Sequence, residues 1–262
     1  MKILMLGDVN GAPGRRILKE NVKRLKSELG LAAVVANCEN AAAGNGITAA
    51  LAEEILEAGV DAITLGDHTW GQKEFALEID RLPKVVRPAN GGPGQPGKGW
   101  ITVTTPLCRF ALVNLVGRTF MNPAECPFRT AEACLKEIPK DLPVFIDFHA
   151  EATSEKNSFA YHLDGRVTAV VGTHTHVQTS DASVLPNGTA YITDLGMCGP
   201  YVSSIGRDLK PVLKKFLTGM PSRFGIAEGP ATLEGAVIDF DQGTRLARSI
   251  EALRIREPLN RP

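Results

Sequence analysis

Two histidines separated by one residue, His174 and His176, are the strongest chemical signal in this 262-residue sequence. They follow the apolar run Thr168 to Val171, which is rich in β-branched residues and ends at Gly172. Such a run is typical of a buried strand. Imidazole is the commonest metal-binding side chain, and open α/β sheets place their sites just beyond strand ends. The pair is therefore a candidate metal-binding motif.

The two rings can be oriented in two ways. In an extended backbone, residues i and i+2 point to the same side. In the turn that follows a strand, the same side chains can instead splay apart and serve two ions. For an isolated His-x-His sequence, two solvent-exposed loop histidines are the more common explanation. The interpretation therefore depends on the residues found at the ends of the other strands.

Carboxylate, amide and imidazole groups also follow the ends of four other predicted strands. These groups belong to Asp8, Glu39, Asn40, Asp67, His68 and His149. Because the carboxyl ends of parallel strands meet along one edge of a sheet, we expect these side chains to gather there with the two histidines. Two divalent ions need several oxygen and nitrogen ligands and one bridging carboxylate. The pattern therefore predicts a metal site.

Each of these residues, taken alone, also has a structural explanation. Asp8 and Asp67 can cap the helices that follow them. His149 can be a buried histidine with a backbone partner, and Glu39-Asn40 can be turn residues. Together, these explanations require the same coincidence at one strand end after another. We therefore favour a metal centre.

Mixed carboxylate, amide and imidazole ligands suit Mn, Fe, Zn or Co. None of the five cysteines forms a Cys-x-x-Cys pair, which argues against a structural zinc site or an iron–sulfur cluster. Cys38, beside Glu39, is more consistent with a small buried side chain than with a ligand. The odd number of cysteines and the lack of a signal-peptide pattern lead us to expect reduced thiols in the cytoplasm.

Glycines 7, 11 and 14 raise the alternative of a dinucleotide-binding loop after the first predicted strand. The Gly-x-Gly-x-x-Gly spacing is absent, however, and Asp8 would place a negative charge against a pyrophosphate. We therefore set this alternative aside.

The composition is that of an ordinary globular protein, with 44% hydrophobic and 22% charged residues. The length allows one large α/β domain or two small ones. The formal net charge is +0, so no excess of basic residues indicates binding to nucleic acid or to an anionic membrane. No apolar run is long enough to span a bilayer.

Strand and helix signals alternate along most of the chain. Strands are expected over residues 2–6, 31–36, 61–65, 100–104, 110–115, 144–148, 168–171, 189–193, 232–240 and 246–255. Helices are expected from about residue 14 to 29, and over 48–57, 72–80, 128–138, 153–163 and 208–217. Gly30 and Gly59 suit the C-terminal ends of helices, and Thr48 suits an N-cap. The last two strands predict a closing hairpin.

The stretch 87–99 is too rich in proline and glycine for regular structure. It could join two domains. We favour a long loop within one domain, because the candidate metal ligands lie on both sides of it.

The order of these motifs resembles that of the calcineurin-like metallophosphoesterases and, more narrowly, of the bacterial YmdB-like phosphodiesterases. The likeness spans nearly the whole chain. It is carried by Gly7-Asp8-Val9, Glu39-Asn40-Ala41-Ala42-Ala43-Gly44, Arg87-Pro88-Ala89-Asn90, Phe148-His149-Ala150-Glu151-Ala152-Thr153-Ser154-Glu155-Lys156 and Gly172-Thr173-His174-Thr175-His176-Val177.

Two positions depart from the broad superfamily. Asp8-Val9-Asn10 stands where the superfamily has Asp-x-His, and Asn40 takes the place of that histidine, as in the narrower group. Gly66-Asp67-His68 stands where Gly-Asn-His is usual.

The resemblance implies a single domain over residues 1–262, folded as a four-layer α/β/β/α sandwich of two mixed sheets. It implies a dinuclear site that hydrolyses phosphodiesters such as 2′,3′-cyclic nucleotides, by attack of a metal-bridging hydroxide. Fe or Mn are the expected metals, with Zn or Co as alternatives. By this likeness, one ion is held by Asp8, Asn40 and His176, the other by Asp67, His149 and His174, with Glu39 bridging and His68 as general acid.

Two other functions stay open. One is a phosphomonoesterase that uses the same site, and the other is a regulatory protein that binds a nucleotide with little turnover. The expected partner is a small phosphodiester or a cyclic nucleotide, and a homodimer or homotetramer is a further possibility.

Overall fold

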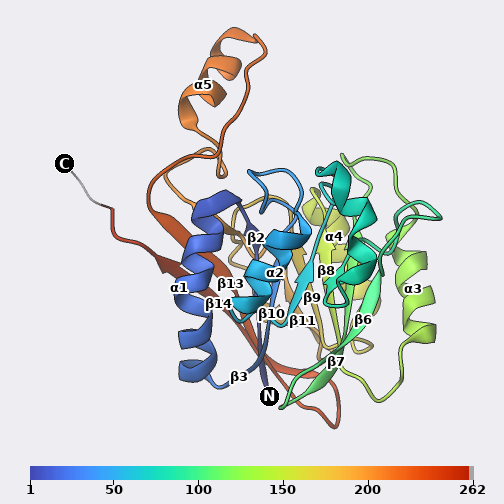
Figure 1. Cartoon of the computed structure of the whole chain (residues 1–262). Helices are drawn as coiled ribbons and strands as arrows, with labels where there is room; N and C mark the ends of the chain where they lie inside the picture. Colours follow the sequence, from blue (N-terminus) through green and yellow to red (C-terminus); the bar gives the residue numbers. More distant parts are fainter. Residues whose placement is uncertain (260–262) are drawn as a thin grey trace.

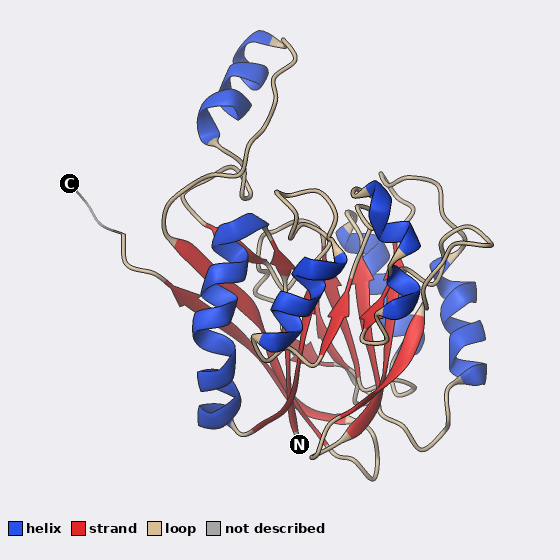
Figure 2. Cartoon of the chain, viewed as in Figure 1, coloured by secondary structure: helices blue, strands red, loops and turns tan. Residues whose placement is uncertain are grey.

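Two β-sheets pack face to face, and helices cover the outer face of each (Figures 1 and 2). The computed structural model describes residues 1–259. Helices α1 (Gly11–Leu29) and α2 (Ala49–Glu57) pack on the first sheet. Helices α3 (Pro127–Glu137) and α4 (Thr153–Leu163) pack on the second. The expected four-layer α/β/β/α sandwich of two mixed sheets is confirmed.

The first sheet has eight strands within the described residues, and β1 (Lys2–Leu6) lies near its centre. From β1, parallel pairing runs through β3 (Leu31–Asn37) and β4 (Ala62–Thr64) to β5 (Val85–Val86). On its other side, β1 pairs antiparallel with β13 (Ala231–Phe240). The remaining strands follow β13 and are β14 (Ala247–Arg256), β12 (Met197–Pro200) and β2 (Asp8–Val9).

The second sheet has six strands within the same residues. Its parallel centre consists of β7 (Arg109–Val116), β8 (Val144–His149), β9 (Ala169–Thr173) and β11 (Ala190–Ile192). Antiparallel strands flank this centre, namely β6 (Trp100–Thr104) and β10 (Ser183–Val184).

Alternation along the strands separates the core into layers. On β1, Leu4 contacts the apolar cluster under the helices, whereas Ile3 and Met5 belong to the cluster between the two sheets. This period of two is what a strand buried on both faces requires. Between the sheets, the ring of Phe145 packs edge-on against Phe110 and Phe240, at centroid distances of 5.2 and 5.3 Å. Such aromatic contacts help to hold the sheets together.

Most predicted elements are present, with ends shifted by a few residues. The Thr48 hydroxyl accepts a hydrogen bond from the N–H of Leu51 at 3.3 Å, and Gly30 ends α1 with a φ of 62°. The predicted hairpin of β13 and β14 is also confirmed. Strands β2, β5, β10 and β12 were not predicted, because runs of two to four residues show no periodicity.

The predicted helix over residues 72–80 is wrong. This stretch forms two short 3₁₀ helices, η1 (Lys73–Leu77) and η2 (Ile79–Arg81), with i to i+3 hydrogen bonds such as Phe75 N–H to the carbonyl of Gln72. The eleven residues between Gly71 and Pro83 would allow about three α-helical turns. A helix of this length depends on packing for its stability, and Phe75 and Ile79 are the buried residues of the two 3₁₀ helices.

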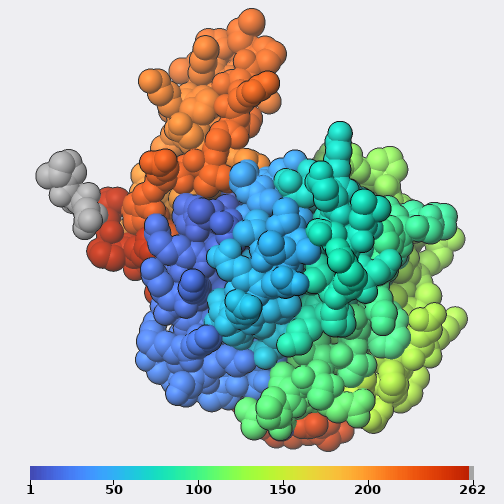
Figure 3. All heavy atoms as spheres, in the orientation of Figure 1, coloured from blue at the N-terminus to red at the C-terminus, as the bar shows by residue number. Residues whose placement is uncertain are grey.

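Between β12 and β13 the chain leaves the sheets and forms α5 (Leu209–Thr218), which stands away from the body of the molecule (Figures 1 and 3). Val212 is its only buried residue, while Phe216 and Leu217 are 82% and 83% exposed. Leu209 and Leu213 on the same helix are also exposed.

The loop over residues 87–99 connects β5 of the first sheet to β6 of the second. The two sheets that it joins share one apolar cluster. Among residues 1–259, no helix combines the length and the apolar character needed to cross a membrane.

Gly172, at the end of β9, lies very close to a neighbouring chain segment. A Cβ atom on Gly172 would lie 1.7 Å from the carbonyl oxygen of Thr193, on the neighbouring chain segment. We predict that Gly172→Ala lowers the free energy of unfolding by about 1–3 kcal/mol, measured by thermal unfolding. Gly225→Ala, where no atom lies within 4 Å of the added Cβ, should change it by no more than about 0.5 kcal/mol. Equal stability of the two variants would contradict the close approach.

Candidate metal centre

The predicted ligands lie together at one end of the sandwich, but they come from both sheets. Asp8 begins β2, and Glu39, Asn40 and Asp67 follow β3 and β4 of the first sheet. His149 ends β8, and His174 and His176 follow β9 of the second sheet. Our expectation of a single sheet edge was therefore wrong in this respect. The two stacked sheets point their parallel strands toward the same end, which the strand-end pattern alone does not reveal.

Four of these residues form a tight cluster. One ligand atom from each lies within 4.8 Å of the others in the set Glu39, Asp67, His149 and His174. The Nε2 atom of His149 is 3.0 Å from Oδ1 of Asp67, 3.3 Å from Oε1 of Glu39 and 3.0 Å from Nδ1 of His174. Carboxylate oxygens and ring nitrogens that converge in this way form a suitable site for a divalent cation.

Asp8, Asn40 and His176 form a second group beside the first. The Oδ1 atom of Asp8 is fully buried and has no hydrogen-bond partner among residues 1–259. It lies 3.7 Å from Nε2 of His176, which is also 3.2 Å from the side-chain nitrogen of Asn40. The side-chain oxygen of Asn40 would face an ion at this position only if the amide group rotated so that its oxygen and nitrogen exchanged places.

The electrostatics of the cluster favour added positive charge. Burial raises the pKa of Asp8. For Glu39, burial acts in the same direction, but the charge and hydrogen bond of His149 outweigh it and lower the pKa. The pKa of His149 is raised although burial opposes this, chiefly because Glu39 faces it. Without an ion, a proton on His149 thus partly takes the place of a cation, and an orphaned buried oxygen on Asp8 remains. The residues therefore fit bound metal ions.

The two histidines of the His-Thr-His turn splay apart, as one of the two expected orientations required. His174 has a φ of 102° and His176 a φ of 64°, both in a region that residues with a side chain rarely occupy. The ring of His174 contacts His149, whereas that of His176 lies near Asp8 and Asn40. The turn therefore supplies one imidazole to each group.

Several residues that we did not predict hold this turn in place. The carboxylate of Asp194 accepts hydrogen bonds from Lys156 at 2.8 Å and from the N–H of Thr175 at 3.1 Å. Both partners of the Lys156–Asp194 ion pair are buried. Asp194 directly follows a predicted strand, as the candidate ligands do. Its position in the sequence therefore does not distinguish a supporting residue from a ligand.

Each of the three histidines His149, His174 and His176 also has a partner on its other ring nitrogen. His149 Nδ1 lies 2.9 Å from the hydroxyl of Thr173, which donates to Asp147 at 2.7 Å. His174 Nε2 lies 3.1 Å from a carboxylate oxygen of Glu151, and His176 Nδ1 lies 2.9 Å from the carbonyl of Ile205. Such partners fix the orientation of a ligand ring and the nitrogen it presents.

His68 belongs to the cluster by position but is less buried than its neighbours. Its side chain is 40% exposed, and its Nδ1 lies 2.9 Å from Oδ1 of Asn40 and 3.3 Å from Oε1 of Glu39. The hydrogen bond to Glu39 raises the pKa of His68. Its Nε2 has no hydrogen bond within the described residues, so one ring nitrogen is anchored while the other stays available. This arrangement suits a group that donates a proton to a substrate.

The chain has close relatives of known name and structure. The model of the family described as YmdB-like protein matches residues 4–253. The chain is 49% identical to the 2′,3′-cyclic-nucleotide 2′-phosphodiesterase of Bacillus subtilis (strain 168), over 98% of both chains. A hypothetical protein from Thermus thermophilus has a similar structure, with a TM-score of 0.92 and 41% identity over 98% of this chain and 100% of that one. A phosphatase from Mycoplasma pneumoniae gives a TM-score of 0.90 and 36% identity over 98% and 93%.

The orphaned oxygen of Asp8 leads to a prediction about stability. In the metal-free protein, Asp8→Asn removes the charge of a buried carboxylate whose Oδ1 has no hydrogen-bond partner among residues 1–259, while Oδ2 accepts from the N–H of His174 at 3.1 Å, so we expect unchanged or higher thermal stability. With Mn²⁺ present, the variant should gain about 1.4–2.7 kcal/mol less than the wild type, equivalent to a 10–100-fold weaker affinity. Thermal unfolding with and without the ion measures both effects.

The exposed Asp141→Asn is the matched control and should alter neither value. A similar loss of stability in metal-free and metal-loaded Asp8→Asn would make Asp8 a purely structural carboxylate.

Proposed function

The chain belongs to the family of YmdB-like proteins, and from this premise we propose that it is a phosphodiesterase acting at a dinuclear metal centre on small phosphodiesters such as 2′,3′-cyclic nucleotides. The observation that carries the proposal is the convergence of Glu39, Asp67, His149 and His174 within 4.8 Å, next to the buried Asp8. The name of the relative that is 49% identical supports the choice of a cyclic diester as substrate class. We also propose that residues 1–262 act as a single domain, in the cytoplasm.

We propose a role in metal binding for seven residues. When bound, two divalent ions would polarise the phosphoryl oxygens and lower the pKa of a bound water toward neutrality. The donor set has oxygen and nitrogen atoms but no thiolate, which suits Fe or Mn, with Zn or Co as alternatives. Cys38 is not a member of the cluster, and its buried thiol contacts the carbonyl of Ala36 at 3.6 Å. One ion would be held by Asp8, Asn40 and His176, the other by Asp67, His149 and His174, with Glu39 shared between them.

His68 supplies the proton that the leaving oxygen needs. Its Nδ1 lies 3.3 Å from Oε1 of Glu39, and this contact does not depend on the orientation of the Asn40 amide, which leaves Nε2 for the substrate. Because Glu39 raises the pKa of His68, the ring retains its proton more readily at neutral pH. A glycine at position 66 keeps this turn close to the cluster, since an added Cβ would lie 2.3 Å from Oε2 of Glu39.

A panel of phosphoesters tests the proposed function. Metal-stripped protein, reloaded with Mn²⁺ or Fe²⁺ in turn, should hydrolyse 2′,3′-cyclic nucleotides faster than the matching 2′- or 3′-monophosphates. A preference for monoesters would favour the phosphomonoesterase. Tight nucleotide binding with background turnover in fully loaded protein would favour the regulatory protein.

We predict that His68→Ala retains both ions but loses turnover unevenly. A general acid typically contributes about 10²–10⁴-fold, and most when the leaving alkoxide is basic. The loss of turnover should therefore be greater for a diester with an alkoxide leaving group than for one with a nitrophenolate leaving group. The measurements are kcat for the two diesters and the metal content of the variant. His174→Ala, which removes a proposed ligand, is the comparison and should lose metal. An equal loss for the two leaving groups would remove His68 from this role.

We further propose that a second copy of the chain covers α5. The residues Leu209, Val212, Leu213, Phe216 and Leu217 form a continuous apolar stripe at helical spacing. A ten-residue helix is marginal in water without packing against something else.

Charge supports a copy of the same chain as the partner. Segment 207–223 contains five basic and one acidic residue, whereas the rest of the chain contains 24 basic and 28 acidic residues. A basic projection and an acidic body attract each other between copies, and closed symmetric homodimers are the commonest oligomers.

We predict that the wild type is a dimer or tetramer by sedimentation velocity and that Phe216→Glu dissociates it. The added carboxylate would be buried without a partner in the interface. Lys136→Glu on the exposed side of α3 is the control for a change of charge, and it should keep the oligomer. A monomeric wild type would refute the proposed assembly.

A further inference from the structure

A pocket of about 120 Å³ adjoins the candidate metal centre, and Asp67 forms part of its wall. Three segments line it, namely the turn after β4, the proline- and glycine-rich loop 87–99, and residues 116–124 after β7. A cavity of about 150 Å³ binds one benzene ring, so this pocket has room for about one ring but not for a whole nucleotide. A group bound there would be next to the cluster.

The lining of this pocket is neutral apart from Asp67. The indole of Trp70, three residues after Asp67, is half-buried and contacts Phe75 at a centroid distance of 6.5 Å. The side-chain amides of Gln95 and Asn122 also line the pocket, and neither forms a hydrogen bond within residues 1–259. An aromatic face and free amide groups are the features that bind a nucleobase, by stacking and by hydrogen bonds to its edge.

One wall of the pocket is fixed by a buried residue of loop 87–99. The side chain of Asn90 accepts a hydrogen bond from the N–H of Val116 at 2.9 Å and donates to the carbonyls of Val116 and Glu125 at 2.7 and 2.9 Å. The backbone N–H of Glu125 donates to the carbonyl of Asn90 at 2.9 Å. Both ends of loop 117–124 are thus held to one side chain. A wall fixed in advance lowers the entropic cost of binding a ligand.

Helix α4 holds the same loop from the other side. The carboxylate of Glu155 accepts hydrogen bonds from the N–H groups of Arg118 and Thr119, each at 3.1 Å. The next residue, Phe120, is 89% exposed and has a φ of 62°, which is uncommon for a bulky side chain. The fixed flanks maintain this conformation directly beside Met121, which lines the pocket. Residues of the sequence motifs 87–90 and 148–156 therefore hold this loop.

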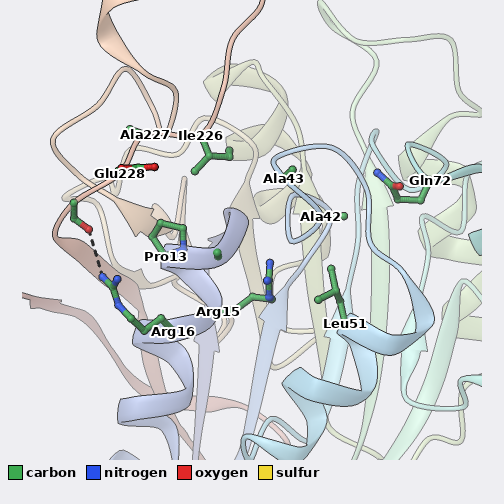
Figure 4. Close-up of a pocket in the computed structure, with 12 residues that line it drawn as sticks. Pro13, Arg15, Arg16, Ala42, Ala43, Leu51, Gln72, Ile226, Ala227 and Glu228 are labelled. Atoms are coloured by element: carbon green, nitrogen blue, oxygen red, sulfur yellow. Dashed lines mark hydrogen bonds between the residues drawn. The ribbon is translucent and has the colours of Figure 1, made fainter.

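A larger pocket, of about 880 Å³, lies elsewhere, between the start of α1, α2 and residues 226–229 (Figure 4). None of the seven proposed metal ligands lines it. Of the arginines that line it, Arg15 donates to the carbonyl of Ala41 through Nη1, although its buried Nε has no hydrogen bond within residues 1–259, and Arg16 binds Glu257. Because no proposed metal ligand forms part of its wall, we do not assign the substrate to this pocket.

We propose that the pocket between Trp70 and loop 117–124 is the subsite for the nucleobase of the substrate. This inference rests on the proposed function and specifies its substrate class, a cyclic phosphodiester that carries a base. Trp70 stacks on the ring, and the amides of Gln95 and Asn122 contact its edge. The diester then lies beside Asp67, at the metal cluster.

The experiment compares a cyclic phosphate with and without a base. kcat/KM is measured for 2′,3′-cyclic AMP and for glycerol 1,2-cyclic phosphate, with Mn²⁺-loaded protein. The wild type should prefer the nucleotide by at least about tenfold, as expected for one stacked base. Trp70→Leu should reduce this preference about tenfold or more, whereas Trp70→Phe, which keeps an aromatic ring, should retain most of it.

A second variant fills the pocket without touching the indole. Gly92 lines the pocket, and the nearest atom to an added Cβ is Nε2 of Gln95 at 3.9 Å. Gly92→Leu should reduce the preference for the nucleotide, and Gly92→Ala, the matched smaller change, should reduce it much less. Metal content is measured for every variant, so that a damaged cluster is recognised.

A wild type without preference for the nucleotide overturns the inference, as does an equal preference in wild type, Trp70→Leu and Gly92→Leu. If the wild type hydrolyses neither diester, the proposed function fails instead. Calorimetric binding of adenosine 3′-monophosphate and of glycerol phosphate then tests the subsite without turnover. Tighter binding of the nucleotide that Trp70→Leu abolishes supports the subsite, and equal affinities refute it.

Discussion

The structure depends on the burial of carboxylates that need a cation. Asp8 and Glu39 are almost completely buried within one cluster, and Oδ1 of Asp8 has no hydrogen-bond partner among the described residues. Two like charges in a medium of low dielectric are unfavourable unless positive charge lies between them. His149 offsets part of this cost through its raised pKa. Bound metal would offset the remainder, so metal binding and folding stability are coupled at this end of the sandwich.

This requirement explains why the surrounding backbone is so closely constrained. Gly66 and Gly172 stand where a side chain would collide with Glu39 and with the backbone at Thr193. His174 and His176 occupy left-handed conformations that would relax without support. The buried Lys156–Asp194 pair provides that support through Thr175. Because the ligands come from both sheets, an ion at the centre would also fasten the sheets to each other.

The sequence allowed a structural feature to be predicted where neighbouring residues alone determine that feature. Strand ends with a carboxylate or an imidazole, and helix ends such as Thr48 and Gly30, depend on neighbouring residues and could be located. The stacking of two sheets could not be derived from the strand ends, because nothing in a strand says which sheet it joins; the family resemblance indicated it. The supporting residues were missed for a related reason. Asp194 follows a predicted strand as the candidate ligands do, and Asp147 lies inside one; their partners, Lys156 and Thr173, become visible once the chain is folded.

Residues of a single sequence motif contribute to two different parts of the site. In the motif 148–156, His149 faces the cluster, Glu151 contacts the far side of His174, and Glu155 holds loop 117–124. One short segment thus contacts both the cluster and the loop that lines the adjoining pocket. The charges on the two sides differ, since the cluster carries the carboxylates while the adjoining pocket is neutral apart from Asp67. Asp67 belongs to both, so its charge strengthens the hold on a cation but opposes the approach of an anionic diester. A neutral group bound in the pocket escapes this repulsion, and its binding energy can then position the phosphate.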